Sequence, residues 1–423
     1  MSGSSQGSGR LRVAFVCQWY PPEPAEVPRG IATALAEAGC DVTVLTGVPN
    51  YPTGAVAAGY SARRSSREVL DGLPVRRTPL YPSHDRSAVR RLANYASWAL
   101  SSAVLGQALL RTSSVALVYS SPATAALPAM VARRLWGTPY VLLVQDVWPD
   151  SVFASGFLTG VAGRLARRVL NVFVDLTYRG AHHVAVTSPG MVDLLAARGV
   201  PRDKLSVVHN WVQEGPTADV PPETVRRVRA SWGVGEDDFV LMYAGNHGRA
   251  QALEPVVEAF AEMTAEDDCH LVLVGDGVTR PGLVERYGAH RRIRFVDPVP
   301  QAEVAALVQA SDAQLVSLAD EALFAVTMPS KVQSILAAGL PLVVSARGDS
   351  AEVVTSARAG LAVAPGDRPG LRDAVRRLAA TDRDERRTMG RRGREWYDAH
   401  MSRRVGSESL RQLLARAAEG RRR

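Results

Sequence analysis

The chain has 423 residues, of which 46% are apolar, and a formal net charge of +8. This length predicts two domains of ordinary size, each with its own core, while three widely spaced cysteines without CxxC spacing argue against a disulfide scaffold or a zinc site. The positive charge indicates a polyanionic partner, but aromatic residues are only 6% and are not interleaved with the arginines, which argues against nucleic acid.

The first ten residues are rich in serine and glycine and contain no apolar segment of signal-peptide length. They predict a disordered leader. Together with the sparse cysteines, Cys17, Cys40 and Cys269, they predict a reducing compartment and a cytoplasmic location.

Apolar runs of strand length alternate with helical patterns from residue 11 to residue 212. The expected strands are 11–17, 42–46, 115–120, 140–144, 183–187 and 205–208. The expected helices are 27–38, 123–136, 161–179 and one that begins at residue 188. Continuous apolar strands separated by helices predict a parallel, doubly wound sheet, and ligands bind such sheets beyond the carboxyl ends of the strands.

The segment from residue 63 to residue 91 holds eight arginines and three acids, and residues 92–110 then carry no charge. That uncharged stretch could span a bilayer, but Asn94, Ser97 and Ser101 place a polar stripe along it. It therefore favours a buried or membrane-surface helix. The flanking arginines suit anionic lipid, so we expect peripheral contact with the inner face of the plasma membrane.

A second set of alternating strands and helices occupies residues 213–400, after a linker at 213–222. The expected strands are 239–243, 271–274, 293–296, 314–317 and 342–345. The expected helices include 253–263, 301–309, 331–338, 372–380 and 384–400. Residues 401–423 form a separate last segment, with a helix at 404–418 and a basic end.

Lys331 is the most informative residue of the second half, because the chain has only two lysines among 50 basic residues. Ser330 predicts an N-cap and Gly339 a C-terminal cap, which places Lys331 in the first turn of a helix. A cation there opposes the helix dipole unless an anion is bound. The pattern predicts a phosphate site; the alternative is an exposed lysine beside an ordinary cap.

Further candidates lie in loops that follow strands. Glycines at 245, 248, 275 and 277 could bring backbone N–H groups close to a phosphate, with Arg249 adding charge, or could simply form tight turns. Asp146 and Asp150 follow a strand in the first half, where one could act as a base and the other hold hydroxyl groups. Alternatively, Asp150 caps a helix that begins at Ser151.

Several motifs in their order along the chain resemble the GT4 family of retaining glycosyltransferases, in the branch that transfers N-acetylamino sugars for bacterial polysaccharides. They are residues 50–54 (NYPTG), 145–150 (QDVWPD), 209–212 (HNWV), 243–248 (YAGNHG), 273–277 (LVGDG) and 329–331 (PSK). The resemblance covers residues 11–400. It implies the GT-B architecture, in which two Rossmann-like domains face each other across a cleft, and a last helix that crosses back to the first domain.

The resemblance also implies a UDP-sugar co-substrate, with no metal and no other cofactor. By position, Lys331, Gly248 and Arg249 would bind the diphosphate, and Gly275 and Val299 would border the base. The donor site would further include Asp276, Val326, Thr327, Ser330 and Ser334. The acceptor, a glycan, a lipid-linked sugar or a small molecule, would meet Trp19, Glu23, Asn50, Tyr51 and Trp148. Asp146, Asp150 and Lys331 are the catalytic candidates.

Three departures from the family pattern matter. Ser334 and Val326 stand where two glutamates are usual, and Gln251 stands where a lysine is common. Residues 23–26 replace a glycine-rich turn after the first strand. Two alternatives remain. One is a UDP-sugar 2-epimerase of the same architecture, against which the absent glutamates count, and the other is a non-catalytic sugar-nucleotide-binding partner protein, which Ser334 and Val326 favour.

Overall fold

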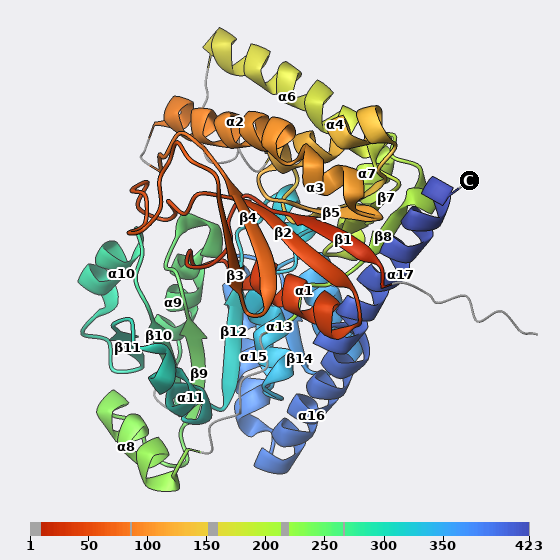
Figure 1. Ribbon diagram of the computed structural model, residues 1–423. Coiled ribbons are helices and arrows are strands. Elements are labelled where there is room, and N and C mark those ends of the chain that lie inside the picture. The colour runs from red at the N-terminus through yellow and green to blue at the C-terminus, as the bar shows by residue number, and fades with distance from the viewer. Residues whose placement is uncertain (1–9, 85–86, 151–159, 213–219, 265–266, 423) are drawn as a thin grey trace, which may run out of the picture. The chain divides into compact units, whose positions relative to one another are not determined.

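The computed structural model describes residues 10–84, 87–150, 160–212, 220–264 and 267–422. The chain divides into two compact units, one comprising Met1–Gln213 with Arg403–Arg423 and the other Glu214–Ser402. Each unit is an α/β domain with a mainly or wholly parallel sheet (Figure 1), so the predicted fold class of two Rossmann-like domains is confirmed.

The first unit contains an eight-stranded sheet in the order β3-β4-β2-β1-β5-β6-β7-β8. Its strands are β1 (Arg12–Val16), β2 (Asp41–Gly47), β3 (Ser66–Leu70), β4 (Leu73–Thr78), β5 (Val115–Ser120), β6 (Tyr140–Val144), β7 (His183–Val186) and β8 (Leu205–Val207). All neighbouring pairs are parallel except β3 with β4. Strand order reverses between β1 and β5, which is the position where such sheets bind ligands.

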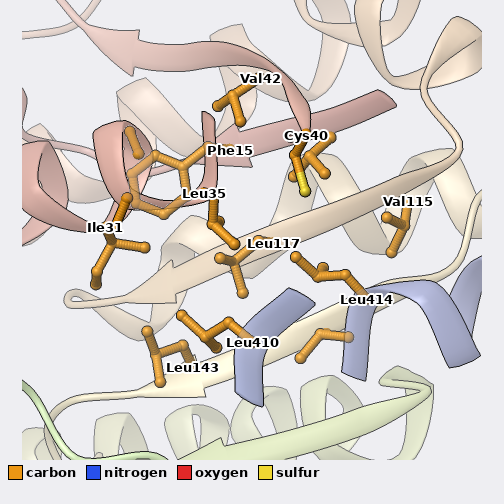
Figure 2. Close-up of a cluster of buried hydrophobic side chains, with 14 of the residues drawn as sticks. Phe15, Ile31, Leu35, Cys40, Val42, Val115, Leu117, Leu143, Leu410 and Leu414 are labelled. Carbon is orange, nitrogen blue, oxygen red and sulfur yellow. The ribbon is translucent and has the colours of Figure 1, made fainter. Parts of the chain in front are cut away.

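Helices cover both faces of this sheet, with α2, α4 and α6 on one face and α1 and α17 on the other (Figure 1). The helices are α1 (Glu26–Glu37), α2 (Ala88–Leu105), α3 (Gln107–Thr112), α4 (Leu127–Trp136), α6 (Gly160–Gly180), α7 (Pro189–Ala197) and α17 (Arg403–Arg422), with short 3-10 turns η1 (Ala123–Ala126) and η2 (Arg202–Lys204). Figure 2 shows the core on the α1 side, where Phe15 and Leu117 of the sheet pack with Leu35 of α1 and with Leu410 and Leu414 of α17. The last helix therefore belongs to the first unit.

The second unit contains a six-stranded parallel sheet in the order β11-β10-β9-β12-β13-β14. Its strands are β9 (Phe239–Ala244), β10 (Cys269–Val274), β11 (Ile293–Val296), β12 (Ala313–Ser317), β13 (Leu342–Ser345) and β14 (Gly360–Val363). Its helices are α8 (Pro222–Trp232), α9 (Leu253–Ala261), α10 (Arg280–Tyr287), α11 (Gln301–Gln309), α12 (Ala322–Ala325), α13 (Ser330–Ala337), α14 (Asp349–Ala357), α15 (Arg368–Ala380) and α16 (Arg383–His400), with the 3-10 turn η3 (Arg249–Gln251). Strand order reverses between β9 and β12.

The structure corrects two sequence-based expectations. Ser330 is the first residue of α13 rather than its N-cap, because Pro329 holds the extended N-cap conformation and no side chain caps the helix. The arginine-rich segment contains the antiparallel hairpin β3–β4, in which Arg77 is buried and paired with Glu68. Arg77 is therefore not available to lipid.

Three predictions lie outside the described residues: the leader up to residue 9, the linker at 213–219 and a helix start at Ser151. Among the described residues, the structure contains no helix that is both long and apolar enough to cross a membrane.

Candidate functional site

Lys331 lies at the carboxyl edge of the second sheet, on α13, the second helix after β12, and beside the loop that follows β9. Its Nζ atom is 3.5 Å from the ring centre of Tyr243, the last residue but one of β9. A Cβ atom at Gly245 would come within 2.7 Å of Lys331 Nζ, so a larger residue there would displace the end of the lysine side chain. The side chain therefore sits at the point where the strand order reverses.

The surroundings of Lys331 disfavour its positive charge. Burial lowers the pKa of Lys331 to about 7, and no other cause contributes. Among the described residues, no carboxylate forms an ion pair with it, and the first turn of α13 contains no acid. The positive charge of Lys331 lies on an aromatic ring at a helix N-terminus, and no negative charge among the described residues balances it. An anion bound there would supply that negative charge.

The loops after β9 and β10 interlock beside this lysine. The His247 N–H donates to the Asp276 carbonyl at 2.8 Å, and the Thr279 hydroxyl donates to the His247 carbonyl at 2.7 Å. Gly275 has a φ of +130°, and a Cβ atom there would collide with the carbonyl oxygen of Gly245. The glycine at 275 is thus required by close packing of two loops, whatever ligand is bound.

We expected the Gly248 backbone N–H to be able to approach a phosphate, and the structure differs from this expectation. The Gly248 N–H donates to Gln251 Oε1 at 3.1 Å, so this N–H already has a partner within the loop. Arg249 begins the turn η3 and is exposed. His247 is fully buried, its ring lies 5.7 Å from that of Tyr243, and burial lowers its pKa, which favours the neutral imidazole.

The other predicted donor residues lie along the same edge of the second sheet but differ in exposure. Asp276, Ser330 and Ser334 are exposed, and Val299, Val326 and Thr327 are partly buried. The Ser334 hydroxyl donates to the Lys331 carbonyl at 3.0 Å. Asp276 Oδ1 accepts from the Gly277 N–H at 2.7 Å, as the turn interpretation of this loop predicts.

The sequence did not reveal the contacts that fix the loop before α13. Gly348 has a φ of +66°, and a Cβ atom there would collide with the Ala325 carbonyl. The hydroxyl of Ser350, in the first turn of α14, donates to the Thr327 carbonyl at 3.3 Å. The available signal was the sequence Gly348-Asp349-Ser350 just after a predicted strand, which is typical of a helix start.

In the first unit, the predicted acceptor residues Trp19, Tyr51 and Trp148 belong to one aromatic cluster. The Trp19 ring lies 5.4 Å from that of Tyr51 and 6.0 Å from that of Tyr95, and Tyr95 lies 6.1 Å from Trp148. His84 adds an edge contact to Tyr51 at 4.6 Å. The structure thus adds Tyr95 and His84 to the residues at the carboxyl ends of β1, β2 and β6.

Glu23 and Asn50 hold the backbone beneath this cluster. The Glu23 carboxylate accepts three backbone N–H bonds, from Tyr20 at 3.1 Å, Asn50 at 2.8 Å and Tyr51 at 2.9 Å. Burial raises the pKa of Glu23 in spite of these bonds. The Asn50 side chain accepts from Asn94 Nδ2 at 3.0 Å, and both residues are buried. Glu23 and Asn50 therefore fix the shape of the loops, because their side chains are hydrogen-bonded within the protein.

The two aspartates after β6 differ in their partners. Asp146 is exposed, and its Oδ2 accepts from the Ser121 hydroxyl at 2.8 Å. Asp150 forms ion pairs with Arg167 at 2.8 Å and with Arg198. Burial would raise the pKa of Asp150, but the bonds and charges of these arginines outweigh it and lower the pKa. Asp146 is therefore the better placed of the two to accept a proton or a hydroxyl group.

Among the described residues, no group of three or more His, Cys, Asp or Glu side chains is arranged to hold a metal ion.

Two family models match the chain in succession. Residues 24–211 match the glycosyl transferase 4-like domain, and residues 238–381 match glycosyl transferases group 1. The chain is 28% identical over 316 residues to a putative colanic acid biosynthesis glycosyl transferase, WcaI, of Escherichia coli, which covers 74% of this chain and 77% of the relative.

Two further similarities are to one relative by sequence and to one solved structure. The N-acetyl-alpha-D-glucosaminyl L-malate synthase of Bacillus anthracis is 27% identical over 212 residues, 49% of this chain and 53% of that protein. The structure of HepE of Anabaena in complex with UDP and glucose matches with a TM-score of 0.66 and 16% identity, over 96% of this chain and all of that one. At this identity the structural match shows the fold alone.

Proposed function

Because this chain belongs to the GT4-type glycosyltransferases of the GT-B fold, we propose that it transfers an N-acetylhexosamine-type sugar from a UDP-sugar donor. The acceptor is a glycan, a lipid-linked sugar or a small molecule. The second unit holds the donor and the first unit holds the acceptor.

One observation carries the donor assignment. Lys331 is a largely buried cation without a carboxylate partner among the described residues, at the carboxyl edge of a parallel sheet and at a helix N-terminus. A diphosphate supplies the missing negative charge and accepts hydrogen bonds from the ammonium group. Lys331 thus holds the leaving group, and a cation in this position needs no metal ion to do so.

Support for the sugar and the base comes from the relatives. One of them is named for an N-acetylglucosaminyl product, and a structural relative is bound to UDP. The family resemblance implies that Ser334 meets the ribose and Val299 borders the base, and Ser334 is exposed while Val299 is partly buried. A UDP-N-acetylhexosamine fits both similarities.

The reaction breaks the bond between the anomeric carbon and the diphosphate oxygen and forms a bond from an acceptor hydroxyl oxygen to that carbon. The acceptor proton passes to an oxygen of the departing diphosphate, so atoms and charge balance without a further reactant. Attack from the face that the diphosphate leaves retains the configuration of the sugar. Asp146, exposed at the carboxyl end of β6, orients the acceptor hydroxyl.

The experiment is a thermal-shift panel of UDP-, GDP- and ADP-sugars, followed by mass spectrometry of reactions with oligosaccharide, lipid-linked and small-molecule acceptors. We expect UDP-N-acetylhexosamines to stabilise the protein most and a product heavier than the acceptor by one N-acetylhexosamine unit. Conversion of the donor to its C2 epimer would instead identify an epimerase. Binding of the donor without any product across the panel would favour a non-catalytic partner protein.

A further inference from the structure

Exposed apolar side chains concentrate on one helical layer of the first unit. The described part of the chain exposes 14 large apolar side chains, and nine of them lie on α2, α4 and α6. They include Leu100 and Val104 of α2, Leu135 and Trp136 of α4, and Val172 and Leu176 of α6. We call the outer surface of these three helices the α2–α4–α6 face.

The helix α2 buries apolar residues such as Trp98, but it also exposes apolar residues where an ordinary surface helix would carry polar ones. Its polar residues point inward: Ser97 accepts from the Tyr81 N–H at 2.8 Å, and Asn94 donates to the Tyr81 carbonyl at 2.7 Å. Its outer side carries Leu100 and Val104, which are 61% and 73% exposed. The polar stripe that the sequence shows along this helix therefore bonds to the segment at Tyr81, and part of the apolar surface of α2 is left outside.

The three helices form one continuous surface. The helix α4 contacts both α2 and α6, and Figure 1 shows all three on the same face of the first sheet. At the end of α4, Trp136 donates from Nε1 to Gln107 at 3.1 Å, and the Arg111 guanidinium lies 5.1 Å from its ring. The exposed apolar side chains of this layer thus belong to helices that contact one another, whereas the other five are spread over the rest of the described chain.

The charge of this layer identifies what covers it. The sequences of α2, α3, α4 and α6 contain nine arginines and a single acid, Asp175, which is a net charge equal to that of the whole chain. Two copies of such a face would repel each other, so a second copy of this chain is a poor partner. Exposed apolar side chains on helices that also carry exposed arginines match the headgroup region of an anionic bilayer, where arginine stems lie along apolar surface and their guanidinium groups reach phosphates.

We propose that the α2–α4–α6 face docks the protein on anionic lipid, as a peripheral contact without a spanning helix. This surface differs from the arginine segment that the sequence singled out. Of the described arginines in that segment, only Arg90 and Arg91 lie on α2, while Arg77 is buried and Arg63 and Arg64 are outside the layer. The proposal is independent of which sugar the protein transfers.

The test is co-sedimentation of the full chain with vesicles of phosphatidylcholine alone or with added phosphatidylglycerol. We expect binding only to the anionic vesicles, and binding that weakens as salt screens the charges. Replacing Leu100 and Val104 together with glutamate should lower vesicle affinity at least tenfold. Val69→Glu is the matched control, because Val69 is 68% exposed but lies on β3.

A second pair of variants tests the charge. Arg134→Gln with Arg168→Gln should weaken binding by roughly fivefold per arginine, the usual worth of a basic residue near an anionic surface. Arg63→Gln with Arg64→Gln, also exposed, should leave binding nearly unchanged. Unchanged thermal unfolding shows that each variant is folded.

Four outcomes would overturn the proposal. They are the absence of vesicle binding, equal binding to neutral and anionic vesicles, equal losses for the face variants and their controls, and a dimer in analytical ultracentrifugation that the glutamate variants dissociate. The last result would make the face an interface between two copies.

Discussion

Lys331 packs closely within the fold, but no carboxylate among the described residues pairs with its ammonium group. Its ammonium group lies on the Tyr243 ring and beside Gly245, and burial brings its pKa to about 7. Burial disfavours the charged form, while a bound diphosphate would favour it. Ligand binding and protonation of this residue are therefore linked.

This linkage gives a pH dependence with a definite sign. In the free protein, Lys331 loses its proton as the pH rises through about 7, so a diphosphate that binds above that pH must recruit a proton. We expect UDP affinity to fall between about pH 7 and about pH 9, with proton uptake measured by calorimetry in buffers of different ionisation enthalpy. Lys331→Ala should abolish the uptake. A native affinity that is constant across this range would contradict the linkage.

Ser334 tests recognition of the ribose. The side chain is exposed on α13, so a longer residue there can extend outward without displacing core atoms. A glutamate can accept from both ribose hydroxyls, whereas serine reaches at most one. Ser334→Glu should tighten UDP by roughly 1 to 3 kcal/mol and leave 2′-deoxy-UDP nearly unchanged. Calorimetry with both ligands measures this, and equal tightening of the two would show that the new carboxylate does not meet the ribose.

Some of these residues could be predicted because their signal lies in the sequence itself. A rare lysine in the first turn of a helix and conspicuous aromatics after strands are visible in the order of the residues. The role of Glu23 was not visible, because its three N–H partners come from two loops that meet only in the folded chain. The pairing of Asp150 with Arg167 and Arg198 depends on similar long-range contacts.

Among the elements, the interlocked loops after β9 and β10 depend on Gly275. Its positive φ is costly for other residues, and a Cβ atom would collide with the Gly245 carbonyl. Gly275→Ala should destabilise the protein by more than about 2 kcal/mol, because steric overlap adds to the backbone cost. Gly282→Ala is the control: it has open space in α10, and alanine should stabilise that helix by about 0.5 to 1 kcal/mol. Chemical denaturation compares the two, and similar effects would refute the argument.

Most of the parallel strands were predictable because they are largely apolar runs, as in β6, where all five residues are buried. The edge strand β14 was not predicted, and none of its four residues is buried. The hairpin β3–β4 was missed because its sequences mix apolar residues with arginine and glutamate. Arg77 can be buried there because Glu68 pairs with it, the Tyr60 ring lies 5.0 Å away, and its guanidinium donates to the carbonyls of Gly47 and Pro21. Such compensation is not visible in a pattern of apolar and polar letters.

At the scale of the whole molecule, the chain leaves the first unit after Gln213 and returns to it at Arg403. The returning helix α17 contributes Leu410 and Leu414 to the core of the first unit, next to Leu35 and Val115 (Figure 2). The helical pattern of residues 404–418 predicted the element. Its place in the first unit came from the family resemblance and not from the pattern itself.

The packing of α17 in the core of the first unit can be tested by hydrogen exchange. Leu414→Ala removes a fully buried side chain and should lower the stability of the first unit by about 2 to 5 kcal/mol. Exchange should then accelerate in β1, β5 and α1, while β9 and β10 stay protected as in the native protein. Equal acceleration in both sheets would mean that α17 supports the two units together.

The central claim, a nucleotide diphosphate held by Lys331, is tested most directly by calorimetric titration of UDP into the native protein, Lys331→Ala and Lys331→Arg. We expect measurable binding by the native protein and a loss of about 1.5 to 3 kcal/mol for alanine, the usual worth of hydrogen bonds to a charged group. Arginine should also bind less tightly, because its wider guanidinium does not fit between Tyr243 and Gly245 as the ammonium does. An affinity for UDP that is unchanged in both variants would contradict the claim.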